Sequence, residues 1–186
     1  MLMKSGKAEG MPYSLSRWTD VPASKWDWFK ESLKAGEMIA FDPRTAIPSH
    51  WSLRSEDTLG LVFWTKDPTN LIKDKALLAG YKVKVHVTAT GWEEMEPGAP
   101  TLEESIYLLR WAVLNYGPEN VTWRFSPVPM VPDVLHRFNR LLNEASFACL
   151  DQVYVSFLQE NDKIPETRTP KERLELLRAM ALLAGR

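Results

Sequence analysis

The sequence predicts an α/β fold, a partial TIM-barrel-like (βα)6 array with a mostly parallel sheet. Three observations lead to this prediction. Short strand-like runs alternate with helical segments six times along the chain, the pattern of parallel sheets with helical crossovers. Two helical segments begin with capping boxes, at Thr101 with Glu104 and at Thr169 with Glu172. No Gly-x-Gly-x-x-Gly or Walker A sequence follows a strand, which disfavours the nucleotide-binding doubly wound sheets.

The six strands are expected from the distribution of β-branched and aromatic residues. They cover residues 13–18, 38–41, 59–65, 82–90, 121–125 and 152–158. The first helix follows N-cap chemistry at Thr19 and Asp20, and Gly36 ends it. The second helix starts at Asp67 and ends near residue 80. The remaining three span about 101–116, 132–145 and 169–185. Residues 42–54, which include two prolines, form a loop or a small hairpin.

The run of residues 59–65 is apolar at both alternating sets of positions, so we expect a strand buried on both faces of the sheet. The valines of the predicted strands are expected to be buried for the same reason. These are Val62, Val85, Val87, Val121, Val153 and Val155.

Composition limits the class of protein. The chain has 186 residues, of which 45% are hydrophobic, which suits a single globular domain and excludes a disordered chain. Its 23 basic and 24 acidic side chains give a formal net charge of −1. This balance excludes coating of nucleic acid by overall charge and leaves room for a local basic cleft. We expect residues 1–11 to be a flexible N-terminal segment and residues 12–186 a single (βα) domain.

Cys149 is the one cysteine of the chain. It excludes an intramolecular disulfide and a metal cluster held by this chain's thiolates alone, and its apolar neighbours predict an inert core residue. The longest apolar runs are far shorter than the ~20 residues of a membrane span, and residues 1–10 lack the apolar segment of a signal peptide. The sequence therefore predicts a cytoplasmic protein without a membrane association.

Polar residues follow the predicted strands where each one ends, which is where (βα) proteins collect their functional groups. They are Ser16, Arg17, Thr19, Asp20, Thr65, Lys66, Thr88, Thr90, Glu94, Glu96, Arg124, Ser126 and Ser156. We expect five of them, Arg17, Asp20, Lys66, Thr88 and Arg124, to converge at one end of the sheet. Such a mildly cationic rim suits a phosphate or a carboxylate.

Structural alternatives exist for these residues. Asp20 and Asp67 suit helix caps, and Arg17 and Arg124 suit ion pairs with Asp20 and Glu96. 

Three of the eight tryptophans, Trp18, Trp64 and Trp92, lie beside the predicted rim and are candidates to line a pocket. The three histidines lack metal-ligand spacing, so no metal site is predicted. Of these, His86 either faces the barrel interior or is a hydrogen-bonded histidine of the sheet.

Four segments, in this order, resemble the motifs of the DUF1848 family. They are residues 13–23, residues 63–68, residues 88–90 with Glu96 and Pro97, and residues 123–127. DUF1848 comprises bacterial and viral proteins of unassigned function. Because its members carry a cysteine cluster near the C-terminus, the family is considered similar to radical S-adenosylmethionine enzymes. The resemblance thus implies a radical-SAM-like partial barrel and S-adenosylmethionine as a candidate cofactor.

The resemblance also assigns ligand-binding positions. Those that match the family pattern are Ser16, Arg17, Thr19, Asp20, Trp64, Lys66, Thr88, Thr90, Glu96 and Arg124. Two features depart from that pattern: Ser126 stands where the family usually has Asp, and the cysteine cluster is missing. One cysteine cannot hold an iron–sulfur cluster. Either the chain is a shortened relative without redox chemistry, or a second chain supplies the missing part, or the sequence is a fragment.

Two classes of function follow. The first is a radical-SAM-like module whose rim binds a nucleotide-like or phosphate-bearing ligand. The second is a non-catalytic module that binds nucleic acid or a partner protein through the cationic rim and its tryptophans. Because six strands do not close an eight-stranded barrel, we expect an open edge beside residues 13–18 or 152–158. Together with the extensively apolar terminal helix, this predicts a homo-oligomer or a second chain that completes the barrel.

Overall fold

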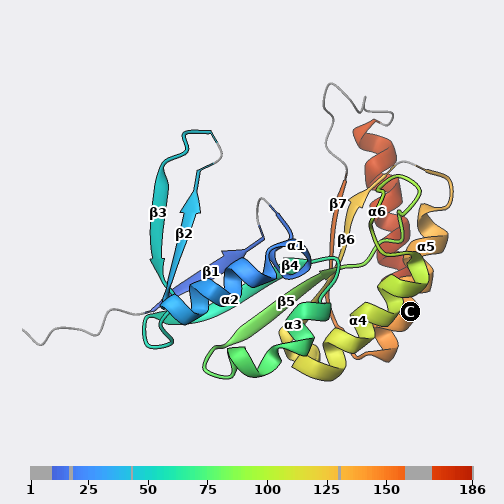
Figure 1. Ribbon diagram of the computed structural model, residues 1–186. Coiled ribbons are helices and arrows are strands. Elements are labelled where there is room, and N and C mark those ends of the chain that lie inside the picture. The colour runs from blue at the N-terminus through green and yellow to red at the C-terminus, as the bar shows by residue number, and fades with distance from the viewer. Residues whose placement is uncertain (1–9, 17–18, 43, 130, 158–168, 186) are drawn as a thin grey trace, which may run out of the picture.

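A five-stranded parallel sheet organises the protein in the computed structural model, which describes residues 10–16, 19–42, 44–129, 131–157 and 169–185. Its strands are β1 (Met11–Leu15), β4 (Thr58–Thr65), β5 (Val83–Thr88), β6 (Val121–Val128) and β7 (Val153–Phe157). They lie in the order β1-β4-β5-β6-β7, and every neighbouring pair is parallel. The sheet curves into half a barrel, and its helices lie along the outer side (Figure 1). The expected partial-barrel α/β fold is confirmed.

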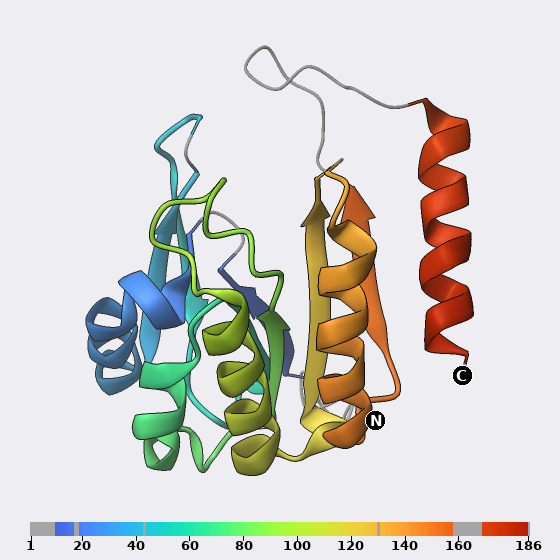
Figure 2. The same ribbon diagram turned by 90° about the vertical axis from the view of Figure 1, so that its right-hand side faces the viewer.

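Most helices begin and end where the capping residues predict, but the predicted first helix is divided into two at Lys25. They are α1 (Val21–Ser24), α2 (Trp26–Ala35), α3 (Thr69–Lys73), α4 (Leu102–Tyr116), α5 (Val134–Phe147) and α6 (Pro170–Ala184), with 3-10 turns η1 (Lys75–Leu78) and η2 (Pro118–Asn120). Both predicted capping boxes form, at the start of α4 and of α6. Gly36 ends α2 in the left-handed conformation, with φ of 70°. Helix α6 packs against α5 and lies beyond β7 (Figure 2).

The second predicted strand does not join the parallel sheet. It forms β2 (Glu37–Phe41), which pairs antiparallel with β3 (Pro48–Ser52) in a separate hairpin that projects from the sheet (Figure 1). The connection is too short for a parallel crossover, so only an antiparallel return is available. Asp42 fixes the turn by accepting hydrogen bonds from the backbone N–H groups of Arg44 and Thr45. The array therefore has five parallel strands, and the hairpin alternative for residues 42–54 is confirmed.

The core lies between the sheet and the helices of its outer side. Phe63 of β4 packs edge-on against Phe29 of α2, with ring centroids 5.4 Å apart. Phe125 of β6 packs in the same manner against Phe138 of α5, at 5.2 Å. All four side chains are fully buried or nearly so. The alternate residues of the strands thus contribute one apolar face to the core.

The other face of the sheet is open, which corrects the prediction of burial on both faces. Trp64 is 36% exposed. Val62, on the same open face, is half-buried. A (βα) half-barrel has helices on its outer side alone, so the residues that would fill a closed barrel's interior remain accessible here. Val153 and Val155 are also half-buried, because β7 is an edge strand. Val85, Val87 and Val121 are buried as predicted.

Cys149 is exposed, so the prediction of a core cysteine is wrong. It occupies the left-handed position after α5, with φ of 59°. Its N–H bonds to the carbonyl of Ser146 and the N–H of Leu150 bonds to the carbonyl of Ala145. This pair of hydrogen bonds is a Schellman motif. The apolar neighbours of Cys149 therefore reflect the helix end rather than burial of the thiol.

Across the residues that the structure describes, no helix has both the length and the apolar character needed to cross a membrane. The division of the chain at residue 12 stays a prediction.

Candidate functional site

The open side of the sheet, here called the inner face, carries alternate residues of the five strands. They are Ser14, Val62, Trp64, Lys84, His86, Thr88, Thr122, Arg124, Ser126, Tyr154 and Ser156. Strand register places Trp64 beside His86, and Arg124 between Thr88 and Tyr154. None of the described helices covers this side (Figures 1 and 2). These eleven positions include two basic side chains, Lys84 and Arg124, and no acidic side chain.

Four inner-face residues form a contiguous cluster, here called the Trp64 cluster: Trp64, His86, Arg124 and Tyr154. The guanidinium carbon of Arg124 lies 4.1 Å from the centroid of the Trp64 ring. The His86 ring stacks on Trp64 with centroids 5.3 Å apart, and Tyr154 lies 5.9 Å from His86 on the other side. The Arg124 contact is a cation–π interaction, worth about 0.5–1 kcal/mol at an exposed site.

Electrostatics of the cluster favour an anion. Among the described residues, no carboxylate forms an ion pair with Arg124. Partial burial lowers the pKa of Arg124 from its ordinary value. Burial, Arg124 and Lys84 lower the pKa of His86 below 6.5, so this ring is neutral near pH 7.

Asp20 holds the carboxyl end of β4 in place. Its Oδ2 accepts hydrogen bonds from the backbone N–H of Lys66 at 2.8 Å and from the Thr65 hydroxyl at 3.0 Å. Its Oδ1 accepts from the N–H of Ala23, so Asp20 also caps α1. Burial is the main reason that the pKa of Asp20 is raised. The capping alternative is therefore correct for Asp20, and the same carboxylate additionally joins α1 to β4.

A cavity of about 740 Å³ opens beside Asp20 at the carboxyl end of the sheet and is here called the rim cavity. Its lining includes Asp20, Lys66, Glu96 and Tyr107. Lys66 and Glu96 form an ion pair. Glu96 therefore pairs with Lys66, and the structural alternative of an Arg124–Glu96 ion pair does not form.

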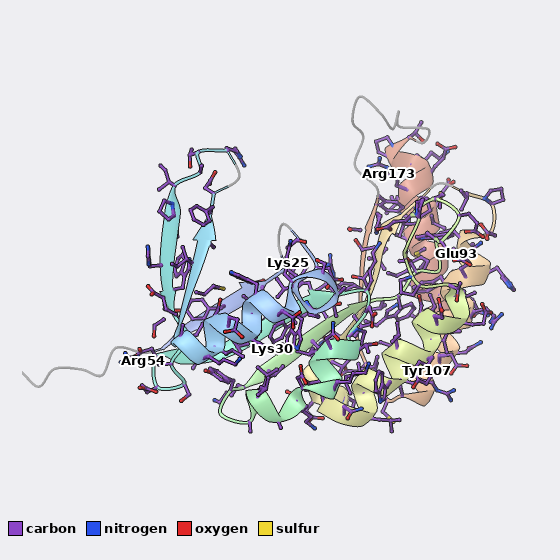
Figure 3. All side chains as sticks on the ribbon, viewed as in Figure 1. Lys25, Lys30, Arg54, Glu93, Tyr107 and Arg173 are labelled. Atoms are coloured by element: carbon purple, nitrogen blue, oxygen red, sulfur yellow. The ribbon has the colours of Figure 1, made fainter. Side chains whose placement is uncertain are left out.

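Glu96 belongs to the loop between β5 and α4, which Arg137 of α5 anchors. Arg137 donates to the carbonyl of Gly91 and to Glu94 and forms an ion pair with Glu93, which is labelled in Figure 3. Trp92 is 3% exposed and donates its indole N–H to the carbonyl of Pro127. Trp92 is therefore a core residue that fixes this loop, and it does not line the rim cavity.

The remaining predicted residues have local roles. Ser16 has φ of 76°, and its hydroxyl accepts the N–H of Val21, while Thr19 contacts Ser24. Thr88 and Thr90 are buried. Arg17 and Trp18 lie outside the described residues. The structure thus groups Asp20, Lys66 and Glu96 at the rim cavity, and Trp64, Thr88 and Arg124 on the inner face.

Sequence reasoning missed Lys84 and Tyr154. Both occupy positions that alternate with core valines along their strands, Lys84 between Val83 and Val85, and Tyr154 between Val153 and Val155. That period of two is a signal for one shared face, and it becomes informative once the face is known to be open.

An iron–sulfur cluster does not fit the residues of this chain. Its single thiol, at Cys149, follows α5 and precedes β7, and so lies toward the opposite end of the sheet from the rim cavity. Within the described parts of the chain, no three His, Cys, Asp or Glu side chains gather in a way that could hold a metal ion.

Fold and site together define an α/β half-barrel with an accessible inner face that carries aromatic rings and cations. Residues 13–181 match the family model described as a domain of unknown function, DUF1848, and the chain belongs to this family. A comparison with curated proteins found no match. The resemblance inferred from the sequence motifs is confirmed.

Proposed function

We propose that the inner face binds a nucleotide-like ligand that carries an anionic group. The observation behind this proposal is the pairing of Arg124 with Trp64 on the open face. Stacking on the indole orients the guanidinium, so its N–H edge can donate to a phosphate or carboxylate. The ring of Trp64, 36% exposed, offers apolar surface to a planar base.

S-adenosylmethionine is one candidate because it combines an adenine ring with a carboxylate. The rim cavity, which lies at the carboxyl end of β4 beyond Trp64, offers Lys66 and Asp20 to further polar groups of such a ligand. Radical chemistry on this ligand needs a cluster, and the 186 residues supply one cysteine. For this chain we therefore propose ligand binding, with thiolates from elsewhere required for any redox step.

Tryptophan fluorescence tests the proposal, because Trp64 is partly exposed beside the proposed site. The purified chain is titrated with AMP and, separately, with S-adenosylmethionine. We expect Arg124→Ala to weaken binding at least about 10-fold, since a charge-assisted hydrogen bond is worth about 1.5–3 kcal/mol. Arg54→Ala is the matched control, because Arg54 is exposed beside the base of the hairpin (Figure 3). Equal affinities of the Arg124→Ala and Arg54→Ala variants would contradict the proposal, as would no binding of either compound.

A further inference from the structure

We infer that the ligand of the inner face is a single-stranded nucleic acid. This inference rests on the proposed binding of a nucleotide at Arg124 and Trp64, and it extends the site from one nucleotide to a strand that crosses β4 to β7. Charge, the spacing of the exposed rings and the open shape of the face support it independently of one another.

Charge on the inner face is complementary to a phosphate backbone. The chain has 24 acidic side chains, yet the inner face has none, while it carries Lys84 and Arg124. Lys84 is exposed and lies beside Val62 in the strand register, toward the amino end of the face from Arg124. Two separated cations without acidic neighbours suit two phosphates of one strand better than the single anionic group of a mononucleotide.

The exposed rings are separated across the face. Trp64 belongs to β4 and Tyr154 to β7, which are three strand spacings apart. Because both rings contact His86, their centroids are at most about 11 Å apart. His86 lies between them, at 5.3 Å and 5.9 Å. A single base covers one of the exposed rings, whereas successive bases of a strand reach both. Four-stranded sheets that bind RNA stack two or three bases on aromatic residues in this way.

The shape of the face suits a chain that enters and leaves. None of the described helices lies over it, and the hairpin and β7 stand at its two sides (Figure 1). The hydroxyls of Ser126 and Ser156, which bond to each other, lie beside Tyr154 and are available to sugar or phosphate oxygens. Stacking and phosphate contacts do not read sequence, so we expect binding with little sequence preference.

The test compares an oligonucleotide with its monomer. Fluorescently labelled dT10 and U10 are titrated with the full chain and followed by fluorescence anisotropy, and AMP binding is measured in parallel through tryptophan fluorescence. We expect both oligonucleotides to bind at least 10-fold more tightly than AMP. We also expect affinity to fall with salt, with a logarithmic slope of about −1.4 for two phosphate contacts on a single strand.

Two variants distinguish binding of a nucleic-acid strand from binding of a single nucleotide. Tyr154→Ala should weaken oligonucleotide binding at least about 5-fold, the lower end for loss of one stacked base, and leave AMP binding unchanged. Lys84→Gln should reduce the salt slope by about 0.7 and also leave AMP binding unchanged. Lys25→Gln is the control, because Lys25 is exposed at the junction of α1 and α2, on the helix side of the sheet (Figure 3). Circular dichroism confirms that each variant is folded.

The outcomes distinguish the two proposals. If AMP binds through Arg124 and the oligonucleotides bind no more tightly than AMP, the inference of a bound strand is refuted and the proposed nucleotide site is retained. The inference of a bound strand is also refuted if Tyr154→Ala and Lys84→Gln leave oligonucleotide affinity unchanged. The same holds if Lys25→Gln weakens oligonucleotide binding as much as they do. If neither AMP nor an oligonucleotide binds, both proposals fail. A preference for dT10 or for U10 supports the inference and identifies DNA or RNA as the source of the strand.

Discussion

Replacement of Asp20 by alanine tests the role of this carboxylate in holding the carboxyl end of β4. The change removes three hydrogen bonds, from the N–H groups of Ala23 and Lys66 and from the Thr65 hydroxyl. Loss of an N-cap costs about 1 kcal/mol, and the part-buried N–H of Lys66, left without its acceptor, costs about 1–3 kcal/mol. Removal of a carboxylate whose pKa burial raises offsets part of this loss. We expect Asp20→Ala to lower the free energy of unfolding by about 2–3 kcal/mol.

Asp67→Ala is the matched control in the neighbouring turn. The Asp67 carboxylate accepts one hydrogen bond, from the backbone N–H of Thr69 at 2.9 Å, and Pro68 rather than Asp67 is the N-cap of α3, so we expect a loss of about 1 kcal/mol. Urea denaturation followed by circular dichroism measures both variants, with stability taken from the midpoint at a constant slope. The reasoning is refuted if Asp20→Ala and Asp67→Ala destabilise the protein equally within about 0.5 kcal/mol.

Three further predictions concern Cys149, His86 and α6. Cys149→Gly should stabilise the protein by about 0.5–1 kcal/mol, because glycine adopts the left-handed conformation at φ of 59° without strain; a lower melting temperature would contradict this. The pKa of His86 is lowered in the folded state, so the unfolded chain takes up the proton first as the pH falls. The free energy of unfolding should therefore decrease as the pH drops below 6.5. Urea titrations at several pH values should show a smaller decrease for His86→Gln. We expect an oligomer at micromolar concentration in sedimentation velocity, because Leu177 and Leu182 of α6 are exposed and β1 and β7 are edge strands. Replacing both leucines with glutamate should weaken the association. A strictly monomeric wild-type protein would refute this expectation.

The helical boundaries could be predicted from the sequence because their causes are local. A capping box or a left-handed glycine acts within one turn of a helix, so Thr101, Thr169 and Gly36 identify the ends of their helices without knowledge of the fold. Strand partners depend on the whole chain. Residues 38–41 look like any other strand, and their membership in a hairpin depends on the antiparallel partner that follows.

The site could be predicted only in part, for a related reason. Asp20, Lys66 and Arg124 follow from their positions at or near strand ends. Trp64 is a candidate from its place beside the rim, but the apolar run of residues 59–65 predicts burial on both faces, because hydrophobicity does not distinguish the inside of a closed barrel from an open sheet. Tyr154 becomes a candidate once the curvature of the sheet and the register of β6 with β7 are known.

The open inner face has a consequence for how this family can diversify. In β4, β5 and β6, odd-numbered residues such as Phe63, Val85 and Trp123 are enclosed by helices, and replacing them with smaller side chains costs several kcal/mol. Even-numbered neighbours that reach solvent, such as Lys84, lie where most replacements change stability by less than about 0.5 kcal/mol. Selection can therefore alter one set of positions while the other set preserves the backbone. Relatives with one scaffold can accordingly come to recognise different molecules through single exchanges along the same strands.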